Sequence, residues 1–156
     1  MFKWLRSLFG VPEPAGPPQT IRLFRTSDST ITQDRISIEQ DGWLIDASEK
    51  QTIRLFEVQH AGLEQCMLTY RAKVKAEGLR GRAFLEMWCR VPGRGEWFSK
   101  GLNQAVTGTA DWANYEIPFY LRKGQKADLV KLNLEVDGVG KIWIKDIELL
   151  QTPLTS

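Results

Sequence analysis

Two stretches between positions 66 and 91 alternate apolar residues with charged and aromatic ones. Arg71 belongs to the first stretch, and Glu86, Trp88 and Arg90 occupy alternate positions of the second. An aromatic plane can lie against the apolar C–H face of a sugar ring, while carboxylate and guanidinium groups can hold its hydroxyl groups. These residue types at this spacing indicate a binding face for a polar, polyhydroxylated ligand.

The same alternation predicts the two half-buried β-strands that would position these side chains. We expect the strands to form an antiparallel hairpin that turns at Gly78–Arg80, with Arg71 directly opposite Glu86. The inward-facing residues would then be Leu68, Tyr70, Ala72 and Val74 on the first strand and Ala83, Leu85, Met87 and Cys89 on the second.

A later strand adds further polar groups to this face. Apolar residues alternate from position 130 to 136, which directs Asn133 and Glu135 to the opposite side. If this strand joins the same sheet, the candidate ligand-binding set is Arg71, Glu86, Trp88, Arg90, Asn133 and Glu135. The competing interpretation is a solvated sheet face, on which an Arg71–Glu86 ion pair would contribute about 0–1 kcal/mol.

Glu86 and Glu135 would share this face, and glycosidases use two carboxyl groups across the scissile bond, so a catalytic pair is the enzyme alternative. The sequence has no strand on which two or three carboxylates alternate, so we predict that the protein is not an enzyme and has no catalytic residues. With one histidine and two cysteines in the chain, a zinc quartet and a histidine-rich metal site are excluded.

Length and charge restrict the function further. The 156 residues suffice for one domain with its own core, and the net charge of +2 is not gathered into a basic stripe. We therefore expect no nucleic-acid partner. Cys66 and Cys89 are interpreted as two buried thiols, which predicts a reducing compartment and a cytoplasmic location.

The chain is expected to have three parts. Residues 1–10 place apolar side chains on one helical face and basic ones largely opposite, which predicts a short amphipathic helical segment. This segment would contact a membrane peripherally, or pack on its own domain or on a partner chain. Residues 11–19 form a proline-rich linker that stays out of the sheet, and residues 20–152 form the folded domain.

From residue 20 onward, short apolar stretches separated by Gly, Pro, Asn and Asp predict many short antiparallel strands. This pattern is typical of an all-β fold, a β-sandwich of the Greek-key or jelly-roll type.

Three motifs in the second half of the chain carry a resemblance. The first contains Trp112, Tyr115, Pro118 and Phe119, the second is Val130-Lys131-Leu132-Asn133-Leu134, and the third runs from Gly138 to Ile147 and includes Trp143. Together they resemble the C-terminal half of galactose-binding-like jelly rolls, a superfamily that includes many non-catalytic carbohydrate-binding modules. The resemblance covers roughly residues 53–150.

The resemblance implies a module that binds carbohydrate and commonly holds a structural calcium. Where the superfamily motif usually reads Asp-Asp, this chain has Lys145-Asp146, so the calcium site is altered, and no other cofactor is expected. The leading hypothesis is a non-catalytic module for a carbohydrate or similar polyhydroxylated ligand. The alternative is a protein-interaction or membrane-peripheral adaptor that uses the same face or residues 1–10.

Overall fold

The computed structural model describes residues 12–155, so the predicted helix in residues 1–10 lies outside the described part of the chain. The strands are β1 (Gln19–Leu23), β2 (Ile36–Glu39), β3 (Gly42–Ala47), β4 (Gln51–Leu63), β5 (Cys66–Val91), β6 (Gly95–Lys100), β7 (Val106–Leu121) and β8 (Ala127–Pro153), with a short 3-10 helix η1 (Leu102–Gln104) between β6 and β7. All strand pairs are antiparallel. The predicted all-β jelly-roll sandwich is confirmed.

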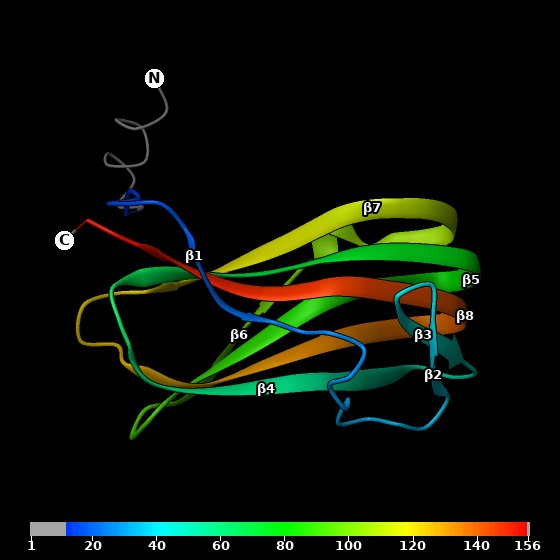
Figure 1. Ribbon diagram of the computed structural model, residues 1–156, viewed down its shortest axis with the longest axis horizontal. Coiled ribbons are helices and arrows are strands. Elements are labelled where there is room, and N and C mark those ends of the chain that lie inside the picture. The colour runs from blue at the N-terminus through cyan, green and yellow to red at the C-terminus, as the bar shows by residue number, and fades with distance from the viewer. Residues whose placement is uncertain (1–11, 156) are drawn as a thin grey trace.

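Two long strands, β5 and β8, join the two layers of the sandwich. They pair along nearly their whole length, from Cys66 opposite Pro153 to Arg90 opposite Leu129. Near their middles both strands bend and double back at the same end of the molecule (Figure 1). One layer, here the β6 layer, contains β4, the first half of β8, the second half of β5, and β6. The other, the β7 layer, contains β1, β2, β3 and β7 together with the first half of β5 and the second half of β8.

Glycine permits this shared bend. Gly81 has φ of +107°, and a Cβ atom there would lie 2.1 Å from the carbonyl oxygen of Asp137. On β8, a Cβ atom at Gly138 would lie 2.0 Å from the carbonyl oxygen of Arg80. The two backbones approach each other so closely at the bend that neither position has room for a side chain.

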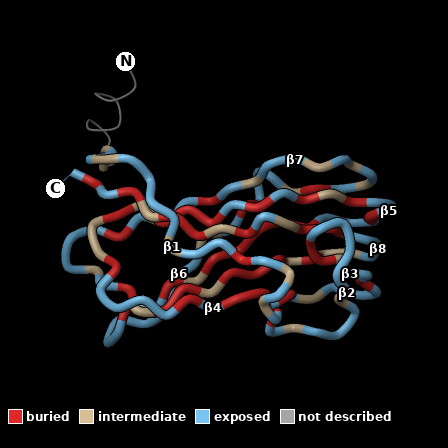
Figure 2. The backbone as a smooth tube through the Cα atoms, viewed as in Figure 1, coloured by how far each residue is buried: buried red, intermediate tan, exposed pale blue. Residues whose placement is uncertain are grey.

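The core lies between the layers, and the inward-facing residues predicted from the alternation are all buried (Figure 2). Tyr70 and Met87, one from each half of β5, belong to the same apolar cluster. Trp43 and Phe56 are packed edge to face, with ring centroids 5.4 Å apart, and Phe56 stacks on Phe24 at 4.0 Å. This aromatic group covers the core where β1, β3 and β4 meet.

The predicted hairpin is wrong. The halves of β5 do not pair with each other: the first half lies between β7 and β8, and the second between β6 and β8. Consequently Arg71 is not opposite Glu86 but pairs in register with Glu116 on β7 and Glu148 on β8. Gly78–Arg80, interpreted as a hairpin turn, is part of the bend between layers.

One smaller expectation also needs correction. The proline-rich segment does touch the sheet, because Pro14 forms a β-bridge with Leu154 and the Ala15 N–H donates to the Pro153 carbonyl at 2.7 Å. The single histidine, His60, is exposed within β4. Among residues 12–155, no helix has the length and apolar character needed to cross a membrane.

Candidate functional site

The outer surface of the β6 layer, here the β6 face, brings together five of the six predicted site residues. Glu86, Trp88 and Arg90 reach it from β5, and Asn133 and Glu135 reach it from β8. Glu86 lies opposite Asn133 on one side and Lys100 of β6 on the other. These positions follow from the alternation of each strand, because the intervening residues point into the core.

The carboxylate of Glu86 is the centre of a hydrogen-bond network. Its Oε1 accepts from the Trp88 indole N–H at 2.9 Å and from the Asn133 side-chain amide at 2.9 Å, and its Oε2 lies 3.6 Å from the Lys100 Nζ. Glu86 is only 3% exposed and Asn133 only 7%. A buried carboxylate is costly unless donors surround it, and here three donors fix its position.

The same network fixes an aromatic pair. The Trp88 and Phe98 rings lie 5.1 Å apart at an interplanar angle of 55°, and the Lys100 Nζ lies 4.7 Å from the centre of the Phe98 ring. Trp88 is half-buried, whereas Phe98 is 54% exposed. The two rings therefore form a solvent-exposed apolar surface, and the hydrogen bond from Trp88 to Glu86 fixes its orientation.

Glu135 is the neighbouring carboxylate on this face. Burial raises its pKa, a hydrogen bond donated by the Thr52 hydroxyl of β4 lowers it, and the negative charge of Glu86 raises it again. Because burial is the strongest influence, the net direction is upward.

Arg90 lies at the margin of the β6 face, in a two-point ion pair. Its Nε and Nη2 lie 2.9 and 3.1 Å from the two carboxylate oxygens of Asp128. The hydrogen bonds from Arg90 lower the pKa of Asp128. The guanidinium is thus already engaged with a carboxylate of its own chain.

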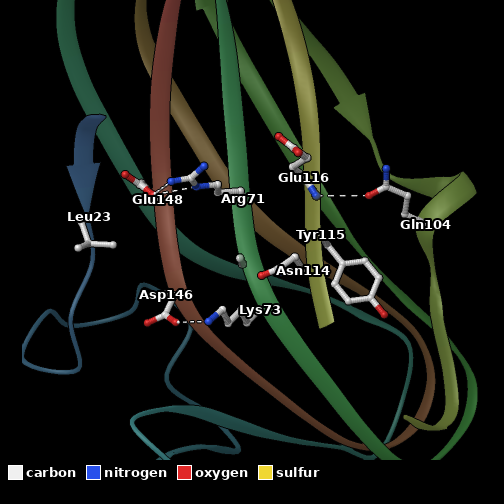
Figure 3. A pocket seen from close by; sticks show the side chains of 10 residues that line it. Leu23, Arg71, Lys73, Gln104, Asn114, Tyr115, Glu116, Asp146 and Glu148 are labelled. Atoms are coloured by element: carbon white, nitrogen blue, oxygen red, sulfur yellow. Dashed lines mark hydrogen bonds and ion pairs between the residues drawn. The ribbon is translucent and has the colours of Figure 1, made fainter. Parts of the chain in front are cut away.

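Arg71 is separated from the other five because it lies on the β7 layer. There it helps to line a cavity of about 630 Å³ on the outer surface of that layer, here the β7 face. Figure 3 shows Arg71 beside Glu148, with contacts of 2.8 and 2.9 Å, and Lys73 beside Asp146 at 3.6 Å. Arg71 therefore belongs to a different surface, and its ion pair with Glu86 does not form.

The site predicted from the sequence did not include three residues that lie on the β6 face: Phe98, Lys100 and Thr52. Phe98 and Lys100 reach the face because β6 pairs with β5 and sets them opposite Trp88 and Glu86. Thr52 carried no local signal, since only the pairing of β4 with β8 sets it opposite Glu135.

The residues present do not fit a structural calcium at the altered motif. Asp146, the remaining carboxylate of the motif, has φ of +53° and faces the Lys73 ammonium. Within residues 12–155, no three His, Cys, Asp or Glu side chains gather closely enough to hold a metal ion. A cation at Asp146 would have to displace Lys73 and find its other ligands elsewhere.

The two cysteines are buried and not bonded to each other. Burial raises the pKa of Cys66 to about 11 and that of Cys89 to about 12. Both thiols therefore remain protonated at neutral pH and behave as apolar core residues.

No protein-family model and no curated protein sequence matches this chain. Solved structures match it in fold. A family 29 carbohydrate-binding module from Piromyces equi is 11% identical, with a TM-score of 0.50 over 87% of this chain and 90% of the module. A Stig cyclase, Fisc, from Fischerella sp. TAU is 10% identical, with a TM-score of 0.53 over 92% of this chain and 81% of the cyclase.

The matching structures thus include both a carbohydrate-binding module and a cyclase. Since a cyclase shares the architecture at similar identity, the likeness establishes the fold and leaves function to the site. The chain has the jelly-roll β-sandwich fold of carbohydrate-binding modules.

Proposed function

We propose that this protein is a non-catalytic binding module for a carbohydrate or a similar polyhydroxylated ligand, which it binds on the β6 face. The observation that carries the proposal is the Trp88–Phe98 pair, held against the buried and hydrogen-bonded Glu86. Exposed aromatic surface that is fixed in orientation, with polar groups beside it, is what recognition of a sugar ring requires.

The burial values divide the face into two roles. Glu86 and Asn133 are nearly inaccessible, so they position other groups rather than touch the ligand. Trp88 and Phe98 supply the stacking surface. Lys100 lies over the Phe98 ring and supplies a hydrogen-bond donor for hydroxyl groups, and Glu135, near Lys100 and Glu86, supplies an acceptor.

Neither Glu86 nor Glu135 has a catalytic role in this proposal. Glu86 is enclosed by its own donors, and Glu135 accepts from Thr52. Glu86 and one oxygen of Glu135 thus accept hydrogen bonds within the face. This arrangement suits binding better than proton transfer to a substrate.

A glycan array with the full chain tests the proposal. Phe98→Ala removes the most exposed ring of the site, and Trp112→Ala is the matched control because Trp112 is a half-buried aromatic residue on β7 that contacts Lys145. We expect array hits that Phe98→Ala loses and Trp112→Ala retains. Since the residues near Asp146 do not fit calcium, the hits should persist in chelator.

Two results would contradict the proposal. Hits that survive in Phe98→Ala would place the sugar elsewhere on the molecule. A blank array from a folded protein would reject carbohydrate as the ligand and favour a protein partner on the same face.

A further inference from the structure

A second cavity, of about 430 Å³, opens where the edges of the two layers meet. β6 is an edge strand of one layer and β7 of the other, since within residues 12–155 each pairs with β5 alone. The cavity is lined by Trp97 of β6, by Phe119 and Tyr120 near the end of β7, and by Arg94 and Gln125 from two turns. Both turns lie at the end of the sandwich opposite the bend (Figure 1). Its volume is in the range of small-molecule sites.

The alternation of β6 gives one aromatic residue to each of two surfaces. Phe98 is opposite Trp88 and contacts it on the β6 face. Trp97, the preceding residue, is opposite Cys89 and lines the second cavity, where it is 46% exposed. Tyr120, on the far side, is 37% exposed. The cavity therefore presents its own aromatic surface, independent of the Trp88–Phe98 pair.

The charged residues that line this cavity in the described part of the chain, Arg94 and Arg122, are both cationic. The turns at 92–95 and 122–126 contain four cationic residues and no carboxylate: Arg94, Arg122, Lys123 and Lys126. None of the residues that line the cavity is acidic. Glu64 approaches one turn by accepting from the Gly124 N–H at 2.5 Å, but it does not line the cavity.

The turn that carries Gln125 is held in shape by its own hydrogen bonds. The Gln125 side chain accepts from the Arg122 N–H at 2.8 Å, and the Gln125 N–H donates to the Arg122 carbonyl at 3.0 Å. In the opposite turn the Arg94 N–H donates to the Val91 carbonyl at 2.9 Å. The cationic rim is thus carried by closed turns next to the aromatic wall, which limits the ordering that a ligand must impose.

From this combination we propose that the cavity is a second binding site, specific for an acidic sugar of the hexuronate class. The apolar face of the pyranose ring would stack on Trp97, and the carboxylate would take charge-assisted hydrogen bonds from the Arg94 guanidinium. The proposal does not rest on the function assigned to the β6 face, because the two sites share β6 but no lining aromatic residue.

The test compares methyl galacturonoside with methyl galactoside, which differ only at C6, where the first has a carboxylate and the second a hydroxymethyl group. The Trp97 indole N–H signal, assigned through Trp97→Phe, is followed by NMR in the full chain while each sugar is added in the millimolar range. We expect the signal to shift with both sugars, with the acidic one binding at least about tenfold more tightly. Arg94→Gln should remove that preference, whereas Phe98→Ala should leave it intact.

Equal affinity for the two sugars would overturn the proposal, as would a Trp97 signal that neither sugar moves. Loss of the preference in Phe98→Ala would also overturn it, because the acidic sugar would then be on the β6 face. A preference retained in Phe98→Ala supports the second site even if the glycan array fails for the first.

Discussion

The outer faces of the two layers hold their carboxylates in different surroundings. On the β6 face the Glu86 side chain is 4% exposed and its donors Trp88 and Asn133 are themselves at least half-buried. On the β7 face Glu148 accepts from the Thr20 hydroxyl and pairs with Arg71, and both of these donors are exposed, the Arg71 side chain to 53%. A carboxylate whose donors are buried is fixed, whereas one whose donors reach water can rearrange. The β6 face is therefore more preorganised for ligand binding than the β7 face.

The bend that separates the two faces should be the most sensitive place in the molecule. Gly81→Ala adds a Cβ atom 2.1 Å from the Asp137 carbonyl oxygen at a φ of +107°. Backbone strain and overpacking combine there, so we expect a loss of at least about 3 kcal/mol in the free energy of unfolding. Urea unfolding followed by tryptophan fluorescence measures it.

Gly95→Ala is the matched control for this substitution. Gly95 has φ of +100°, but nothing lies within 4 Å of its Cβ position, so only the backbone strain of about 1 kcal/mol is expected. Equal losses in the two variants would show that the close approach of β5 and β8 is not what requires glycine.

Glu86→Ala should distinguish the two faces directly. It leaves the Trp88 indole N–H and the Asn133 amide without their acceptor, at a cost of about 2–3 kcal/mol. Glu148→Ala should cost about 1 kcal/mol, because its donors Arg71 and Thr20 are both exposed and can turn to water. Denaturant unfolding of both variants checks the difference, and a smaller loss for Glu86→Ala than for Glu148→Ala would refute the contrast.

Trp88→Phe tests the indole hydrogen bond of the network. An aromatic ring remains, while part of the ring area and the N–H donor to Glu86 are lost, so a cost of at least about 1 kcal/mol is expected. Trp112→Phe on the β7 layer loses the same ring area and should change the free energy of unfolding by less, about 0.5 kcal/mol, since the Lys145 ammonium at 4.2 Å can stay over the smaller ring. If the two substitutions cost the same, the indole bond to Glu86 adds nothing to stability.

The smallest effect should come from the titration of Glu135. Its pKa is raised in the folded state, chiefly by burial, so the unfolded chain gives up this proton at lower pH. Its contribution is therefore fully present below the pKa of the unfolded chain and is lost as pH rises through the folded-state pKa. Relative to Glu135→Gln, the wild type should lose stability across this acidic window in urea unfolding. A difference that does not change with pH would contradict the direction of the shift.

The inward and outward assignment of β5 could be predicted from the sequence because it depends only on local alternation. Leu68 and Leu85 are buried and Arg71 and Arg90 are exposed, as the period of two requires. The pairing could not be predicted. Glycines at a turn and at a bend look alike locally, and the partner that both halves of β5 share is β8, which begins only at Ala127, far beyond the end of β5 at Val91.

The candidate site was predictable to the same extent. Glu86, Asn133 and Glu135 meet on one face because the alternation of two strands placed them there and the strands proved to be neighbours. Arg71 was assigned to this face only through the incorrect hairpin. Thr52 could not have been identified, since its place beside Glu135 depends on the register between β4 and β8.

The most direct test of the central claim is an NMR titration of the full chain with the strongest oligosaccharide from the glycan array. The indole N–H signals of Trp88 and Trp112, each assigned through its phenylalanine variant, report on the β6 face and the β7 layer respectively. We predict that the Trp88 signal shifts in a saturable way while the Trp112 signal stays in place. A saturable shift of Trp112 with an unmoved Trp88 would contradict the assignment of carbohydrate recognition to the β6 face.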